Sequence, residues 1–192
     1  MQFGLRRLAK TAAALATGLS LTMASGAAYA HHSFAMFDNT QVRVFTGVVT
    51  RINPDANHLQ IFFAPLNDEH TTVVRDEAGD PIIWAVEMAG SAQAAAMGIT
   101  VNNFPPGTIF SVGLYPLRNG QPGGDRGNMG LWKCPANTPP APGAMCDSVD
   151  GATQHGEGEI PVADVELDTP FVPGQETTQE YDDEEEGGEA DG

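Results

Sequence analysis

Positive charge is scarce in this sequence. Its 192 residues include nine lysines and arginines against 25 aspartates and glutamates, so the net charge at neutral pH is −16. Three of the nine cations, Arg6, Arg7 and Lys10, lie in the first ten residues, and losing them takes the net charge from −16 to −19. A chain this acidic repels nucleic acid and anionic lipid surfaces, which excludes nucleic acid as a partner and favours metal ions or basic proteins.

Long apolar runs are also missing, with one short exception near the start. Residues 11–24 are apolar but rich in Ala and Thr, and the run is too short to predict a membrane span. It follows a basic segment and precedes Ala28-Tyr29-Ala30, the small-residue pattern that signal peptidase reads. We therefore predict a signal peptide over residues 1–30, cleaved after Ala30, and no membrane span in the mature chain.

Cysteine is limited to two residues, Cys134 and Cys146. In an exported protein an isolated pair predicts a disulfide. The bond would close a short loop rich in Pro and Gly and stabilise the fold by about 3 kcal/mol. A metal site would need further ligands nearby, and a redox site would need a Cys-x-x-Cys spacing, so the sequence favours a structural disulfide over either alternative.

The motifs that usually announce an enzyme are not found. The sequence has no Gly-x-Ser-x-Gly, no His-Glu-x-x-His and no catalytic Cys–His arrangement. The glycine-rich segment at residues 119–127 is followed by neither a helix nor a Lys-Ser/Thr pair, which argues against phosphate binding. We therefore predict a protein that is not an enzyme.

What the sequence does contain is a series of β-type patterns. Alternating apolar and polar residues, rich in β-branched and aromatic types, predict five strands. These are Val42–Ile52, His58–Ala64, Ile82–Met88, Thr108–Leu117 and Met129–Lys133. A hairpin excursion at residues 65–81 joins the second strand to the third. A short helix is expected over Ser91–Gly98, because an N-cap-type Ser precedes good helix formers and a Gly ends them.

This order of three strands, a helix and two strands predicts an all-β protein with a small five-stranded OB-like barrel. Gly47 lies in the middle of the first strand, where such a barrel requires a strong bend. The predicted domain covers residues 31–150 and includes the disulfide loop. Residues 151–168 form an extended arm that either adds a strand or hangs free, and residues 169–192 form a disordered acidic tail.

The most specific candidate site is the new amino terminus. Cleavage after Ala30 gives His31 a free α-amine beside its imidazole, and His32 adds a second imidazole. Copper(II) favours nitrogen donors, and an amino-terminal histidine completed by a distant one is a histidine brace. Three other histidines are available, His58, His70 and His155, of which His58 is the best placed. Alternatively, the pair merely follows a processing site or serves in packing and capping.

Other polar and aromatic residues favour structural roles. Glu87 lies at the end of the third predicted strand, where it is a candidate ligand or general base. With so few cations in the mature chain, we instead expect Glu87 to form an ion pair with Arg118. Trp84 and Trp132 fall in strands and are expected in the core.

Several segments carry a resemblance. They are HHSFAMFD at residues 31–38, GVV at 47–49, NP at 53–54, WAVEMAG at 84–90 and PLRNGQPGG at 116–124. Together they resemble a family of small exported bacterial proteins known only as a domain of unknown function. The resemblance implies a periplasmic destination and a compact β domain, and it implies no activity.

Two positions depart from the pattern of that family. Its members commonly have Asn-Pro-His after the first strand, where this chain has Asp55, and His-Pro-Leu-Arg before the glycine loop, where it has Tyr115. Two imidazoles are therefore missing or displaced. Asp55 offers an oxygen ligand, which is a weaker donor for copper.

The sequence thus predicts a periplasmic, non-enzymatic binding or accessory protein, with copper or a similar divalent metal as the candidate ligand of its amino-terminal histidines. One alternative is a metal-free interaction module that uses the barrel face or the acidic tail to bind a basic protein. A second alternative is a copper-dependent oxidative enzyme built on the same histidines.

Overall fold

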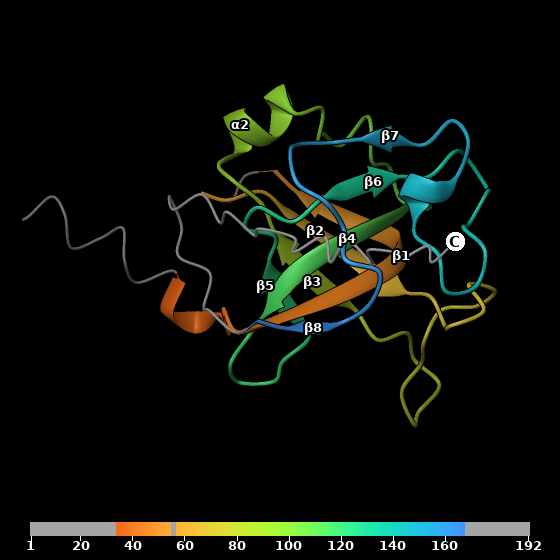
Figure 1. Ribbon diagram of the computed structural model, residues 1–192, viewed down its shortest axis with the longest axis horizontal. Coiled ribbons are helices and arrows are strands. Elements are labelled where there is room, and N and C mark those ends of the chain that lie inside the picture. Colours follow the sequence, from red (N-terminus) through yellow and green to blue (C-terminus); the bar gives the residue numbers. More distant parts are fainter. Residues whose placement is uncertain (1–33, 55–56, 168–192) are drawn as a thin grey trace, which may run out of the picture.

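The computed structural model describes residues 34–54 and 57–167, and most of its regular structure is β-strand (Figure 1). The strands are β1 (Gln41–Asn53), β2 (Gln60–Pro65), β3 (Trp84–Glu87), β4 (Ile109–Pro116), β5 (Gly123–Asp125), β6 (Leu131–Lys133), β7 (Thr153–Gln154) and β8 (Val165–Glu166). The helices are α2 (Ser91–Ala96) and two 3-10 turns, η1 (Phe34–Met36) and η2 (Cys146–Ser148). The all-β prediction is confirmed, and α2 lies between the third and fourth strands as expected.

Five of the strands close into a ring. β1 pairs with β2, β2 with β3, β3 with β5, β5 with β4, and β4 returns to β1. The β3–β5 pair is parallel, and the other four pairs are antiparallel. Outside the ring, β6 and β7 extend the sheet beyond β4, and β8 pairs with the start of β1.

The fifth strand of the ring is not the one that the sequence predicts. Met129–Lys133 was expected to fill this place, but Leu131–Lys133 forms β6, on the outer side of β4. The ring is closed instead by β5, which comes from the glycine-rich segment predicted as a loop. A side chain at Gly124 would collide with the carbonyl oxygen of Tyr115 and with Leu114. The strand therefore needs glycine there, and that removes the side-chain pattern by which strands are recognised.

β1 bends so that it can pair on both of its edges. Residues 43–48 pair with β4 and residues 47–53 pair with β2, so Gly47 and the residue after it take part in both ladders. A Cβ atom at Gly47 would lie 2.5 Å from Cδ2 of Phe63. The change of partner therefore falls at Gly47, where the sequence predicts a bend, and the β1–β2 register shifts just after it, between Val49 and Arg51.

The core fills the ring and is closed at one end by the segment around α2. Its fully buried residues come from all the larger strands and from α2, and they include Ile61, Phe63, Val86, Ala94, Ile99, Phe104, Phe110, Val112, Leu114 and Leu131. Phe110 stands edge-to-face with Phe63 and with Phe104, at ring-centroid distances of 5.2 and 6.2 Å. These contacts join the two sides of the ring to the segment that follows α2.

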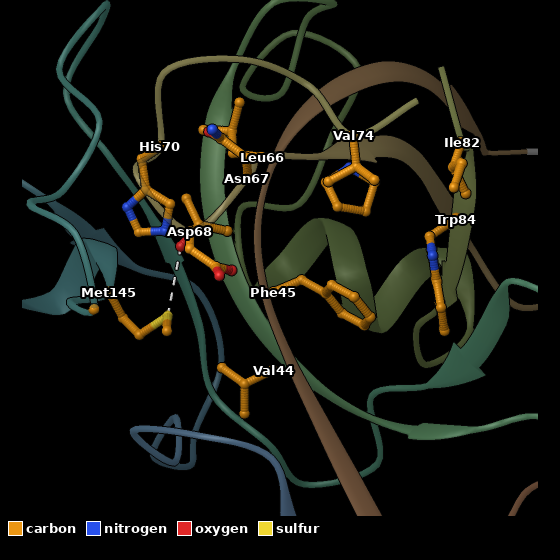
Figure 2. A pocket seen from close by; sticks show the side chains of 13 residues that line it. Val44, Phe45, Leu66, Asn67, Asp68, His70, Val74, Ile82, Trp84 and Met145 are labelled. Atoms are coloured by element: carbon orange, nitrogen blue, oxygen red, sulfur yellow. Dashed lines mark hydrogen bonds between the residues drawn. The ribbon is translucent and has the colours of Figure 1, made fainter. Parts of the chain in front are cut away.

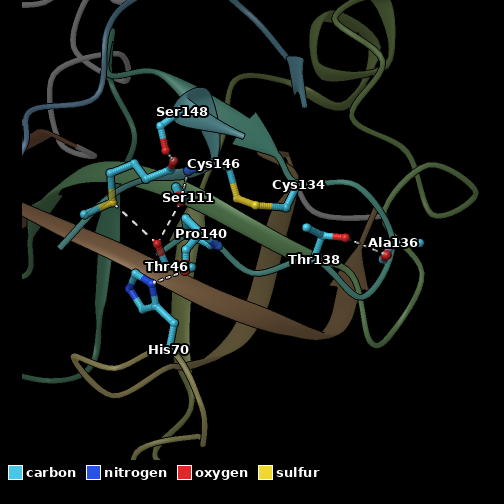
Figure 3. Close-up of a disulfide and its surroundings, with 10 residues drawn as sticks. Thr46, His70, Ser111, Cys134, Ala136, Thr138, Pro140, Cys146 and Ser148 are labelled. Carbon is cyan, nitrogen blue, oxygen red and sulfur yellow. Dashed lines mark hydrogen bonds between the residues drawn. A yellow bond between two sulfur atoms is a disulfide. The ribbon is translucent and has the colours of Figure 1, made fainter. Parts of the chain in front are cut away.

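The predicted disulfide between Cys134 and Cys146 is confirmed, with the two Cα atoms 5.0 Å apart (Figure 3). Cys146 is fully buried, and its backbone N–H donates to Oγ of Ser111 on β4. The Ser111 hydroxyl also hydrogen-bonds the hydroxyl of Thr46 on β1, at 2.8 Å. The disulfide loop is therefore tied to two strands of the ring as well as to β6.

The segment after the disulfide returns to the sheet. Val165 and Glu166 form β8 opposite Gln41 and Val42, so the arm adds a strand at this point. The predicted signal peptide and acidic tail lie outside the described residues. Within the described ranges, no helix is both long and apolar enough to cross a membrane.

A substitution at Gly47 should test the bend. We expect Gly47→Ala to lower the free energy of unfolding by about 1 to 3 kcal/mol, because its methyl group collides with the Phe63 ring. Denaturant unfolding measures the change. Gly90→Ala is the matched control, because its Cβ would lie 3.7 Å from the nearest atom, and it should cost less than about 1 kcal/mol. Equal losses for the two variants would contradict the account.

Candidate functional site

The amino-terminal histidines, His31 and His32, lie outside the described residues. The description begins at η1 (Phe34–Met36), and Phe37 then forms a β-bridge with Leu117, just after β4. Phe37 is buried and packs in a small apolar cluster that includes Tyr115. The chain that follows the two histidines is therefore fixed at the end of β4.

His58 pairs with Glu87. Its Nδ1 lies 2.7 Å from Oε1 of Glu87, and the side chains are 42% and 20% exposed. Glu87 ends β3 and pairs with Gln60 at the start of β2. His58 lies two residues before Gln60, so this register places its imidazole next to the Glu87 carboxylate. The imidazole is held by its Nδ1 and remains partly open to solvent.

The expected ion pair between Glu87 and Arg118 is wrong. Within residues 34–54 and 57–167 the ion pairs are His58–Glu87 and Arg43–Asp164. Because β5 lies between β3 and β4, Arg118, two residues past the end of β4, is separated from the end of β3. Arg118 lies near Asp38 instead. There the hydrogen bond from the Thr40 hydroxyl is the main cause that lowers the pKa of Asp38, and the charge of Arg118 is a minor one.

Asp125 adds a second carboxyl group that sequence reasoning missed. It ends β5, stands opposite Glu87 in the parallel β3–β5 pair and is 9% exposed. Burial raises the pKa of Asp125 to about 6. The hydrogen bond from the Gly127 N–H opposes this shift, the charge of Glu87 adds to it to a lesser extent, and His58 and Arg126 oppose it weakly. No sequence pattern distinguished Asp125, because it follows two glycines in an apparent loop. We call His58, Glu87 and Asp125 the His58 cluster.

Arg126 follows Asp125 and hydrogen-bonds the backbone around the cluster. It is 6% exposed, and its Nη1 donates to the carbonyl oxygens of Met129 and Glu157, at 2.7 and 3.4 Å. Its backbone N–H donates to the carbonyl oxygen of Glu87. Burial lowers the pKa of the Arg126 guanidinium, and the nearby Asp125 opposes this. Arg126 therefore fixes the end of β5 to β3 and to the segment after β7.

Tyr115 occupies the position where the resembling family commonly has histidine. It stands opposite Asp125 in the β4–β5 pair, is 1% exposed and donates its hydroxyl to Oδ1 of Asn128. Burial, and to a lesser extent the charge of Asp125, raises the pKa of the phenol. This side chain is therefore a neutral, buried hydrogen-bond donor beside the cluster.

The other two histidines lie away from the cluster and serve other contacts. Nδ1 of His155 lies 3.0 Å from the carbonyl oxygen of Met97, its ring packs edge-on against Phe104, and burial lowers its pKa. Nδ1 of His70 lies 3.1 Å from the carbonyl oxygen of Pro140 in the disulfide loop. Of the three candidates to complete an amino-terminal metal site, His58 alone has a carboxylate on Nδ1.

Within the described part of the chain, no three His, Cys, Asp or Glu side chains converge closely enough to hold a metal ion. His58 therefore needs ligands from other residues before a metal site is complete. His31, His32 and Asp55 lie outside the described residues, so the geometry neither joins them to His58 nor separates them from it.

A family model described as a family of unknown function, DUF6152, matches residues 19–126, more than half of the chain. The chain belongs to the DUF6152 family. No curated protein and no solved structure matches it. The DUF6152 region contains all three residues of the His58 cluster and ends one residue after Asp125, so the disulfide and β6 to β8 follow it.

The titration of Asp125 should be visible in the stability of the protein. A carboxyl whose pKa is about 6 when folded and about 3.8 when unfolded keeps a proton that the unfolded chain loses. The free energy of unfolding therefore falls as pH rises from about 4 to about 6, and the loss persists above that range. Asp125→Asn is neutral throughout and should gain roughly 2 to 3 kcal/mol relative to the native chain between pH 4 and 7.5.

Denaturant unfolding at the two pH values measures this difference. The control is Asp80→Asn, which removes one negative charge from an exposed position and should show no comparable gain. A gain for Asp125→Asn that is the same at pH 4 and pH 7.5 would contradict the raised pKa.

Proposed function

We propose that this DUF6152 protein is an exported, periplasmic metal-binding accessory protein that holds copper(II) through its amino-terminal histidines and His58. The observation that supports this most is the His58–Glu87 pair, with 2.7 Å between Nδ1 and Oε1. Histidines that bind metals commonly give their other ring N–H to a carboxylate, which fixes the tautomer and makes the free nitrogen a better ligand.

With a proton on Nδ1 and bound to Glu87, His58 presents Nε2 as a lone-pair donor. The His58 side chain is 42% exposed, so the imidazole is partly accessible from solvent. The role assigned to Glu87 is therefore to orient the imidazole. As an ion pair alone, the partly exposed His58–Glu87 contact would contribute little to stability.

The proposal requires the amino terminus to reach the His58 cluster from its anchor at Phe37. Phe37 bridges Leu117, whose N–H donates to the carbonyl oxygen of Gly123 at the start of β5. β5 then runs two residues to Asp125 beside Glu87. Three peptide units join His31 to Phe34, where η1 begins, and an extended chain of that length spans up to about 10 Å. The anchor of the amino-terminal segment and the His58 cluster thus lie at opposite ends of the short strand β5.

Charge favours a cation at this site. Glu87 and Asp125 stand side by side, and the mature chain has a net charge of −19. A divalent ion near the cluster would relieve the repulsion that helps to raise the pKa of Asp125. Because the sequence has no nucleophile–base motif, we propose that the protein binds or delivers metal without catalysing a reaction.

Copper(II) titration of protein that begins at His31 tests the proposal. We expect His31→Ala and His58→Ala each to raise Kd by about tenfold or more, and Glu87→Gln, which loses the orienting charge, by about tenfold. Affinity should also fall in acid, because the amine and imidazoles must be deprotonated to bind. Competition with a chelator of known affinity measures Kd.

Two controls separate the site from general binding to histidine. Protein whose amino terminus is acetylated at His31 loses the α-amine donor and should bind as weakly as His31→Ala. His70→Asn, which removes an imidazole elsewhere, should leave Kd within about twofold. The proposal fails if Kd is unchanged by both His31→Ala and acetylation of the amino terminus. Tight copper binding accompanied by oxidation of a substrate would favour the enzyme alternative over an accessory role.

A further inference from the structure

A second, separate feature is a half-open pocket of about 410 Å³ between β1, the β2–β3 excursion and the disulfide loop (Figure 2). A pocket of this size suits a small organic molecule. Its lining includes no lysine and no arginine, and it consists of Val44, Phe45, Thr46, Pro65, Leu66, Asn67, Asp68, His70, Val74, Ile82, Trp84, Gly143 and Met145.

The two ends of the pocket differ in chemistry. Figure 2 shows Trp84 on one side, Asp68 and His70 on the other, and the ring of Phe45 between them. The Phe45 and Trp84 rings lie 4.5 Å apart, and both side chains are only partly buried. Trp84, expected as a core aromatic, therefore packs against the core and also offers ring surface to the pocket.

Most polar groups around the pocket are already engaged. The backbone carbonyl oxygens of Thr46, Pro65 and Asn67 accept hydrogen bonds from the N–H groups of Leu66, Val74 and His70 in turn. The side-chain amide and hydroxyl groups of the lining are engaged as well: Oδ1 of Asn67 accepts from two backbone N–H groups, and the Thr46 hydroxyl bonds Ser111 and the Met145 sulfur. A ligand that must donate several hydrogen bonds would find few acceptors here.

Asp68 is an acceptor that is not engaged. Its carboxylate is exposed at the pocket and makes no hydrogen bond or ion pair with any residue in the described ranges. A pocket with aromatic faces, one unengaged carboxylate and no basic side chain is complementary to a cation with an apolar surface. Quaternary ammonium groups fit best, because they have a positive charge and no N–H to satisfy.

The walls are held in place before any ligand arrives. His70 has a φ of 53°, in the left-handed region, which costs about 1 kcal/mol or more for a residue with a side chain. Its imidazole hydrogen-bonds Pro140, and the disulfide fixes the loop that contains Pro140 and Met145 (Figure 3). The rim of the pocket is thus built from two loops tied to each other.

We propose that this pocket binds a small quaternary ammonium compound, with its methylated nitrogen between the rings of Phe45 and Trp84 and the carboxylate of Asp68. The site is separate from the His58 cluster and does not depend on metal. Because the pocket is half open and Asp68 is exposed, millimolar affinity is expected.

Choline and its neutral isostere 3,3-dimethylbutan-1-ol are the probes. Two-dimensional NMR of the full mature protein at low salt follows the indole N–H of Trp84, with Trp132, outside the pocket, as the internal reference. We expect choline to shift the Trp84 signal saturably and to bind about fivefold or more tightly than the neutral alcohol. Asp68→Asn should weaken choline binding by about threefold and leave the alcohol unchanged.

The matched control is Glu77→Gln, which removes one negative charge from the same excursion away from the pocket and should leave both affinities unchanged. Trp84→Leu, followed by the backbone signal of Phe45, should weaken choline binding by about tenfold. Equal affinity for choline and the alcohol would overturn the proposal in favour of a neutral apolar ligand. No saturable shift with choline, or equal effects of Asp68→Asn and Glu77→Gln, would also overturn it.

Discussion

The double pairing of β1 is the constraint on which the rest of the structure depends. One strand of 13 residues pairs with β4 through its first half and with β2 through its second, and the change of partner falls at Gly47. The ring can close only because Gly47 leaves room for the ring of Phe63. β4 and β2 pair with different parts of β1, and β3 and the short strand β5 complete the ring between them.

The chemistry of the candidate site follows from that closure. The parallel pairing of β3 with β5 sets Glu87 beside Asp125, and the antiparallel pairing of β2 with β3 brings His58 to Glu87. His58 therefore contacts Glu87 where β2 begins and β3 ends, and Asp125 lies at the end of the neighbouring strand β5. The raised pKa of Asp125, about 6, reflects chiefly the burial of its carboxyl group, and the charge of Glu87 adds a smaller part.

The sequence was a good guide wherever side chains signal structure, and a poor one where glycine replaces them. The β-branched and aromatic runs predicted β1 to β4, the Ser-to-Gly segment predicted α2, and export predicted the disulfide. β5 was taken for a loop because its strand position requires glycine. The missed strand hid Asp125 and led to the wrong partner for Glu87, since strand order decides which charges meet.

The central claim is that His58, oriented by Glu87, completes a copper site begun by the amino-terminal histidine. Electron–nuclear double resonance of copper(II)-loaded protein that begins at His31 tests it most directly, because it detects each nitrogen bound to the metal. The account predicts coupling to the α-amine nitrogen and to at least two imidazoles, with one imidazole lost in His58→Ala. The same set of nitrogen couplings in the native protein and in His58→Ala would contradict it.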